Sequence, residues 1–152
     1  MEIITWNNKY AKDFKILNLQ WLEEYFFVEP HDEEVLGNPE EFIIRPGGNI
    51  LFLKEGKEIV GCLAFLKISE GIFELTKMAI LKEQRGKQLG NYLLKEGIDF
   101  ARSHSWRKLI LYSNRKLENA IHLYRKYGFI EIAIEESNPY TRGDIKMELN
   151  LS

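Results

Sequence analysis

The stretch ELTKMAILKEQRGKQLGNYLLK, from Glu74 to Lys95, decides the fold of this chain. Residues 74–81 alternate and end in an apolar run, a pattern that predicts a β-strand. From Leu89 onward, apolar or small residues recur at helical spacing, which predicts a helix that continues to about Ser103. A short turn that contains Gly86 separates the two. The stretch is therefore a strand, a glycine-bearing turn and a helix.

The turn has the chemistry of an anion site. The first N–H groups of a helix have no partner within it, and the positive end of the helix dipole lies beside them. Gly86 and Gly90 allow a phosphate to approach the backbone closely. Arg85 and Lys87 add positive charge, and an arginine can bind two phosphate oxygens at once. On its own, however, a glycine pair of this kind is a weak motif.

The rest of the chain predicts a mixed α+β domain. A strand, helix and strand over residues 72–113 normally forms a parallel pair with a right-handed crossover. Gly128, followed by the apolar Phe129, is placed to end a helix, and Pro30 is expected to interrupt one. The other predicted strands are 2–6, 50–54, 59–67, 129–134 and 144–149, and the other predicted helical segments are 10–26, 32–36, 40–44 and 117–124.

Length and composition favour one domain over residues 1–152. The chain has 152 residues, 45% of them apolar and 12% aromatic, enough for a sizeable core. No apolar stretch approaches membrane-spanning length and no signal peptide is recognisable, so a cytoplasmic protein is the expectation. The only cysteine, Cys62, lies in an apolar run, which predicts a buried side chain and excludes intrachain disulfides and a thiolate metal cage.

Charge is distributed unevenly, although the net charge of −2 is too small to indicate nucleic-acid binding. Residues 1–48 hold 4 basic and 10 acidic side chains, whereas residues 77–116 hold 10 basic and 3 acidic ones. A polyanionic cofactor at one end and a cationic acceptor at the other would fit this asymmetry. Two solvated faces of opposite sign would fit it equally well.

Two ordered motifs resemble those of the GNAT acyltransferase superfamily. Residues 85–90, RGKQLG, resemble its motif R/Q-x-x-G-x-G/A, with Gln88 at the position of the first motif glycine. Residues 119–129, NAIHLYRKYGF, are similar to its pattern A-x-x-L-Y-x-x-x-G-F. A narrower likeness, to one bacterial branch of small GNAT proteins with mostly unassigned acceptors, rests on four short segments: PGG at 46–48, ELTKMA at 74–79, SNRKL at 113–117 and NPYTRGD at 138–144.

The resemblance implies a layered α/β/α GNAT fold, with a mixed, mostly antiparallel sheet of about seven strands and about four helices. It also implies an acetyl-CoA-dependent N-acetyltransferase that moves an acetyl group directly to a primary amine of a small molecule or peptide. The backbone N–H groups of Met78, Ala79 and Ile80 would bind the thioester carbonyl, and Asn114 the pantetheine arm. The motif positions implied to bind the cofactor are Arg85, Gly86, Lys87, Gln88, Leu89, Gly90, Asn119 and Tyr124.

The proposed chemistry needs an acid and a base. A lysine-like amine is ~99.9% protonated at pH 7, a deficit of ~4–5 kcal/mol, so a base or a water chain must remove its proton. Glu74, on the strand before the turn, is the candidate base, although it could be a solvated glutamate at a strand start. Tyr124 is the candidate acid for the leaving thiolate, although a tyrosine on an apolar helix stripe is commonly a core residue.

Other functions stay open at this point. A nucleotide-phosphate regulator would use the same turn, but Lys87 is not followed by the Ser or Thr of a Walker motif. A GNAT-fold sensor that binds acyl-CoA without turnover would keep the turn and dispense with Glu74 and Tyr124. The three histidines have no metal spacing, and no metal is expected. Loops 23–34 and 135–142 would flank the acceptor, no nucleic-acid or membrane partner is indicated, and a homodimer is possible in principle.

Overall fold

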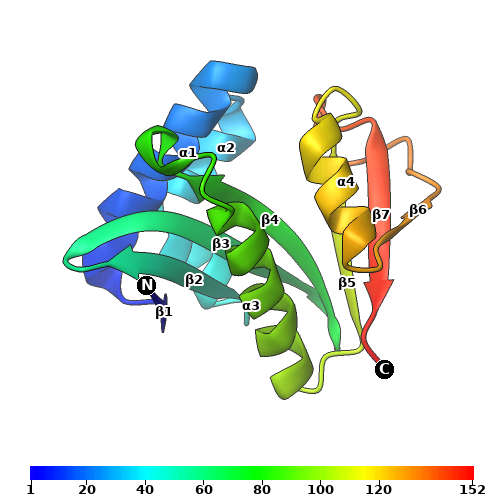
Figure 1. The fold of residues 1–152 in the computed structure, drawn as a ribbon. Coiled ribbons are helices and arrows are strands. Elements are labelled where there is room, and N and C mark those ends of the chain that lie inside the picture. The colour runs from blue at the N-terminus through cyan, green and yellow to red at the C-terminus, as the bar shows by residue number, and fades with distance from the viewer.

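A seven-stranded sheet forms the centre of the molecule, with helices on both of its faces (Figure 1). The computed structural model describes all residues, Met1 to Ser152. The strands are β1 (Glu2–Thr5), β2 (Asn49–Glu55), β3 (Glu58–Ser69), β4 (Ile72–Ile80), β5 (Lys108–Ser113), β6 (Ile130–Ile132) and β7 (Ile145–Asn150). The helices are α1 (Ala11–Tyr25), α2 (Pro30–Gly37), α3 (Leu89–Ser103) and α4 (Glu118–Lys126), with short helical turns at Asn8–Tyr10, Glu40–Ile44 and Lys82–Gln84. The predicted fold class, a mixed and mostly antiparallel sheet, is confirmed.

The core lies on both faces of the sheet. On one face α1 and α2 pack against residues such as Phe52, Cys62 and Ala64. On the other face α3 and α4 pack against residues such as Leu63 and Phe65. β3 supplies side chains to both, so its sequence is a nearly unbroken apolar run rather than an alternating one.

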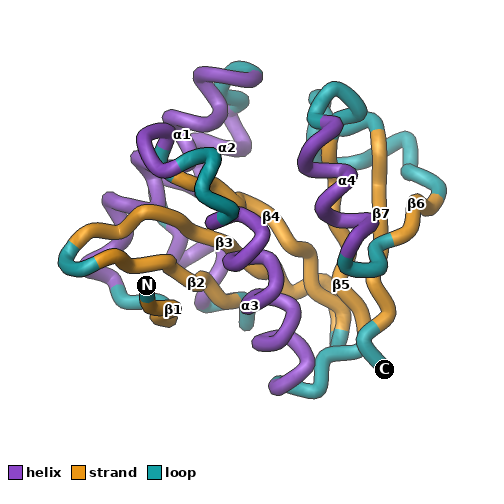
Figure 2. The backbone as a smooth tube through the Cα atoms, in the orientation of Figure 1, coloured by secondary structure: helices purple, strands orange, loops and turns teal.

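β4 and β5 are neighbours for only part of their length. Their parallel pairing, which the sequence predicted, joins Ile72–Glu74 to Lys108–Ile110 and then stops. Beyond this short seam the strands diverge, and the sheet opens between β1–β4 and β5–β7–β6 (Figure 2). The segment of β4 from Leu75 to Ile80 therefore has strand partners on the β3 side only.

A β-bulge lies in the divergent part of β4. The register between β3 and β4 shifts between the pairs Cys62–Ala79 and Ala64–Thr76, so that two residues of β4 face one of β3. Lys77, one of the two, has a positive φ of 54°, a backbone conformation that is costly for a residue with a side chain. The bulge bends β4 at the point where it leaves β5.

The role of Pro30 and the length of β6 differ from the prediction. Pro30 does not interrupt a helix but begins α2 at the first helical position, where its missing N–H costs nothing. β6 covers only three residues of the predicted 129–134. The predicted end of α4 is confirmed: Gly128 has φ 100°, its N–H donates to the Arg125 carbonyl, and Phe129 N–H donates to that of Tyr124. Every helix is too short or too polar to span a bilayer.

Candidate active site

A cleft opens where β4 and β5 separate. Its wall is built from the end of α1, the bulged part of β4, the end of β5, the start of α4 and the loop before β7. Hydroxyl, amide and aromatic side chains make up much of the lining. Its charged members are Lys77 and Arg142, and no carboxylate lines it. The cleft is thus a polar and aromatic opening between the halves of the sheet.

The glycine-bearing turn has the free donors that an anion site requires. None of the six consecutive backbone N–H groups from Gly86 to Asn91 donates a hydrogen bond within the protein. The last three of them belong to the first turn of α3, where the helix dipole adds positive potential. No acidic residue lies in that turn. The turn at which the sequence predicts diphosphate binding therefore presents a row of free amides.

Gln88 explains why the motif usually has glycine at its position. It caps α3 with φ 62° and ψ 21°, in the left-handed region that glycine adopts freely and other residues adopt at a cost. The substitution therefore retains the turn conformation and its amide. The backbone N–H of Gln88 has no acceptor within the protein and remains available to a ligand.

Arg85 does not extend freely from the turn. Its guanidinium pairs with Glu24 of α1, Nε donates to the carbonyl of Ile80 at 3.3 Å, and Nη2 is buried without a partner. Lys87 is exposed and bonds Gln84. The turn's free charge is thus carried by Lys87, while Arg85 ties the turn to α1.

The predicted oxyanion donors lie at the bulge. Met78 lines the cleft, whereas Ala79 and Ile80 follow it and pair with β3. Because no strand pairs with this part of β4 on the β5 side, its backbone faces the opening there. The structure therefore brings Met78 to the cleft and sets Ala79 and Ile80 beside it.

Tyr124, the candidate acid, lines the cleft from α4. Its hydroxyl has no hydrogen-bond partner among the protein's side chains, and its ring packs edge-on against Phe129 with centroids 5.8 Å apart. Burial raises the pKa of Tyr124 to about 12, so the phenol keeps its proton across the neutral range. The group is in place to donate a hydrogen bond into the opening.

The two candidate asparagines differ in position. Asn114 lines the cleft, but its side chain already donates to the Arg142 carbonyl at 2.8 Å and accepts from Lys116 N–H at 2.9 Å. It therefore fixes the loop before β7 in place. Asn119 is exposed on the first turn of α4 and does not line the cleft.

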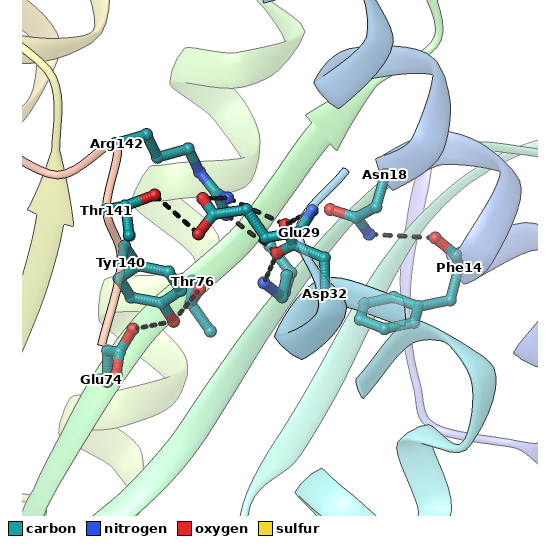
Figure 3. Close-up of polar contacts among 10 residues, drawn as sticks. Phe14, Asn18, Glu29, Asp32, Glu74, Thr76, Tyr140, Thr141 and Arg142 are labelled. Carbon is teal, nitrogen blue, oxygen red and sulfur yellow. Dashed lines mark hydrogen bonds and ion pairs between the residues drawn. The ribbon is translucent and has the colours of Figure 1, made fainter. Parts of the chain in front are cut away.

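Glu74, the candidate base, is buried below the cleft wall, with 4% of its surface exposed. The hydroxyl of Tyr140 donates to its Oε2 at 2.7 Å (Figure 3). Burial raises the pKa of Glu74, and the hydrogen bond from Tyr140 opposes that rise. Tyr140 lines the cleft and Glu74 does not, so Glu74 is hydrogen-bonded to a residue of the cleft wall without belonging to that wall.

A buried ion network joins α2 to the cleft wall. Asp32 accepts from Lys77 Nζ at 3.1 Å and from both terminal nitrogens of Arg142 at 2.9 and 3.0 Å. Glu29 accepts from Arg142 at 2.8 Å and from Thr141 at 2.7 Å (Figure 3). Burial alone would raise the pKa of Asp32, but Arg142 and Lys77 outweigh it and hold that pKa at about 2. Two residues of the acidic half are therefore neutralised within the protein.

Several polar cleft residues were not identified as site candidates from the sequence, among them Asn18, Tyr140 and Arg142. Asn18 is a polar residue on the apolar stripe of α1, which is the signal that could have identified it. Its Nδ2 bonds the Phe14 carbonyl at 2.9 Å and its Oδ1 has no protein partner. Tyr140 and Arg142 lie in a loop, where periodicity carries no information, although their segment was part of the narrower likeness.

Cys62 is buried in the core, as predicted. Its Sγ accepts a weak contact from Asn18 and donates one to the Lys77 carbonyl, both at 3.4 Å. Burial raises its pKa to about 12, so a thiolate is not accessible near neutral pH. The cleft therefore has no cysteine nucleophile.

Comparison with known proteins agrees with this geometry. The model of the Acetyltransferase (GNAT) family matches residues 13–129. An uncharacterized N-acetyltransferase of Schizosaccharomyces pombe is 30% identical over 123 residues, which cover 77% of this chain and 74% of that protein. The mycothiol acetyltransferase of Corynebacterium glutamicum strain R is 35% identical over 81 residues, and the match spans only 28% of its length.

Solved structures share the fold along the whole chain. An acetyltransferase of the GNAT family from Staphylococcus aureus Mu50 superposes with a TM-score of 0.85 over 99% of both chains, at 21% identity. At that identity the likeness concerns the fold alone.

Proposed function

The chain belongs to the GNAT family of N-acetyltransferases, and we propose from this premise that it transfers an acetyl group from acetyl-CoA directly to a primary amine. The observation that carries the proposal is the row of free N–H groups from Gly86 to Asn91 beside an opened sheet. A diphosphate on this row would place a pantetheine arm along the gap between β4 and β5. The cleft chemistry supports the same assignment.

The cofactor's thioester would lie beside the β4 bulge. Backbone N–H groups around Met78 would hydrogen-bond the carbonyl oxygen as it gains negative charge. The side chains of Ala79 and Ile80 need only pack there, since the backbone does the binding. Amides that a sheet holds in place require little reorganisation when charge develops.

Tyr124 would act on the leaving group. When the amine nitrogen bonds the carbonyl carbon and the carbon–sulfur bond breaks, the Tyr124 hydroxyl donates to the thiolate. A phenol with a raised pKa is a suitable partner because it stays protonated until the thiolate forms. Its unpaired hydroxyl supports this role. Cys62 is unsuitable as an acetyl carrier, which supports direct transfer.

Glu74 would receive the proton of the amine through Tyr140. The amine hydrogen moves to the Tyr140 oxygen while the Tyr140 proton moves to Glu74 Oε2, along the 2.7 Å hydrogen bond. The phenol is regenerated and Glu74 becomes neutral, a form that its burial favours. The raised pKa makes Glu74 a stronger base than an exposed glutamate.

An acceptor screen tests the proposed function. Thiol release from acetyl-CoA is measured with pooled primary amines, and acetylated product is identified by mass. Release that depends on both an amine and the protein is expected. Binding of CoA without release from any pool would instead favour the acyl-CoA sensor.

A further inference from the structure

Resting on the proposed function, we infer that the acceptor amine also carries a carboxylate, and that the free edge of the Arg142 guanidinium binds it. The substrate class is a short amino carboxylate with an apolar or aromatic side chain, such as an α-amino acid. Polyamines are disfavoured.

The charged residues that line the cleft are both basic. Lys77 and Arg142 line it, whereas their partners Asp32 and Glu29 do not. Of the two basic side chains, Arg142 is the more exposed at 15%, whereas that of Lys77 is only 4% exposed and is held by Asp32. An acceptor with several ammonium groups would meet Arg142 and would find no carboxylate among the residues that line the cleft, which opposes its binding.

Two N–H donors of the Arg142 guanidinium have no partner within the protein. A guanidinium has five N–H donors, and three of those of Arg142 are used: both of Nη1, on Glu29 and Asp32, and one of Nη2, on Asp32. The remaining two, on Nε and Nη2, form the side edge of the group, which matches the two oxygens of one carboxylate. Nε has no protein partner and is not sealed from solvent.

The network holds this edge in a fixed orientation. Asp32 binds the end of the guanidinium through both oxygens, and the Arg142 side chain is only 15% exposed. Its guanidinium also lies 5.1 Å from the ring centroid of Tyr140 and 5.9 Å from that of Phe26. A donor pair that is ordered before binding loses little conformational entropy when a ligand arrives.

The rest of the cleft wall suits the other parts of such a ligand. Trp21 and Phe26 of the α1 end offer aromatic surface for an apolar side chain. Asn18 Oδ1 is an unpaired acceptor that can take an N–H of the amine. Tyr140, which would relay the amine proton, is two residues from Arg142 in the same loop. Carboxylate, amine and apolar groups of one small molecule would each find a partner.

A purely structural role for Arg142 is the alternative. The residue also links α2 to the loop before β7, and loss of that link would lower activity with every acceptor alike. Pairs of acceptors that differ only by a carboxylate separate the two roles: phenylalanine with phenethylamine, tryptophan with tryptamine, and lysine with cadaverine.

The experiment compares kcat/KM for each pair in the wild type and in Arg142→Lys, which keeps the charge beside Asp32 but removes the two-donor edge. We expect the wild type to prefer the carboxylated member at least about tenfold. Arg142→Lys should lower kcat/KM about 10- to 100-fold for phenylalanine and less than about threefold for phenethylamine. Arg45→Lys, exposed and paired with Glu41 outside the cleft, is the matched control and should change neither.

A wild-type preference for phenethylamine or cadaverine would overturn the inference and leave the proposed function intact. An equal loss for both members of a pair in Arg142→Lys would assign Arg142 a structural role and also overturn it.

Calorimetry separates the remaining case, in which no amine is acetylated and the proposed function fails. Phenylalanine is titrated into CoA-saturated protein. Binding to the wild type that Arg142→Lys abolishes would support the carboxylate site without catalysis. Absence of binding to the wild type would refute the site as well.

Discussion

Tyr140 closes the cleft wall over Glu74: its hydroxyl donates a hydrogen bond of 2.7 Å to Glu74 Oε2 from a position 66 residues further along the chain. Glu74 is thereby a buried carboxylate with one defined route to the cleft. Thr76 Oγ1 lies 3.4 Å from the same hydroxyl. This arrangement makes the proton route testable by removing one oxygen atom.

Tyr140→Phe removes that oxygen and keeps the ring. We expect kcat to fall about 100-fold with a smaller change in KM, because proton transfer is lost while the cleft shape remains.

The wild-type rate should rise with pH through the raised pKa of Glu74, since the base must be ionised. Loss of the hydrogen bond raises that pKa further, so residual activity should rise at higher pH. If kcat and the pH profile of Tyr140→Phe equalled those of the wild type, the proton relay would be refuted. Tyr10→Phe is the control, because Tyr10 lies outside the cleft.

Tyr124→Phe tests the acid. Turnover should fall about 10- to 100-fold at neutral pH, because the thiolate loses its hydrogen-bond donor. The affinity for CoA, measured by calorimetry, should change less than about threefold, since the hydroxyl is not needed to bind the diphosphate. Turnover equal to that of the wild type across neutral pH would leave Tyr124 as a packing residue.

Gly90→Pro tests the backbone amides directly. Proline removes the N–H in the first turn of α3, where the helix does not use it. Gly90→Ala is the matched control: it keeps the N–H, and a Cβ there has nothing within 4 Å. We expect the proline variant to bind CoA about tenfold more weakly than the alanine variant. Equal affinities in two variants of equal helix content would place the diphosphate elsewhere.

Asp32→Asn tests the buried network. Lys77, with a side chain 4% exposed, would lose its only ion partner, so the free energy of unfolding should fall by about 3–5 kcal/mol. The folded pKa of Asp32, about 2, lies below the ordinary value of 3.8 for an aspartate side chain. The stabilisation is therefore fully present above about pH 4 and is lost as the pH falls toward 2. Denaturant unfolding at pH 7 and at low pH should show the variant's deficit shrinking, whereas Glu33→Gln, exposed on the same helix, should show little deficit at either.

Gln88→Gly should relieve backbone strain at the cap of α3. The left-handed conformation costs a non-glycine residue about 1–2 kcal/mol, and glycine loses about 0.5–1 kcal/mol to chain entropy. The net gain in the free energy of unfolding is therefore expected to lie between about 0 and about 1.5 kcal/mol. Gln88→Ala keeps the strain and should show no gain. A destabilised glycine variant would mean that the Gln88 side chain itself supports the turn.

Much of the fold could be predicted because its signals are local. The alternation and helical spacing of residues 72–113 located β4, α3 and β5, and Gly128 located the end of α4. The role of Pro30 was predicted wrongly because a proline can mark either the end of one helix or the first turn of the next. In the structure it begins α2. The divergence of β4 from β5 depends on strand pairing between distant parts of the chain, so no local sequence pattern predicts it.

The site was predictable in its backbone and less so in its side chains. The motif located the amides of Gly86 to Gly90, because N–H groups follow from the turn itself. The contacts of Arg85 with Glu24 and of Arg142 with Asp32 span 61 and 110 residues. Such pairs have no local sequence signal, which is why the acidic half appeared to face an acceptor rather than its own basic side chains.

The short seam between β4 and β5 also has a mechanical consequence. Three residue pairs at one end join two leaves of a single sheet, so tilting one leaf against the other disturbs few hydrogen bonds. A ligand lodged between the leaves would restrict that tilt, and the lost freedom would count against its affinity. Substrate binding should therefore make the molecule more rigid as well as fill the cleft.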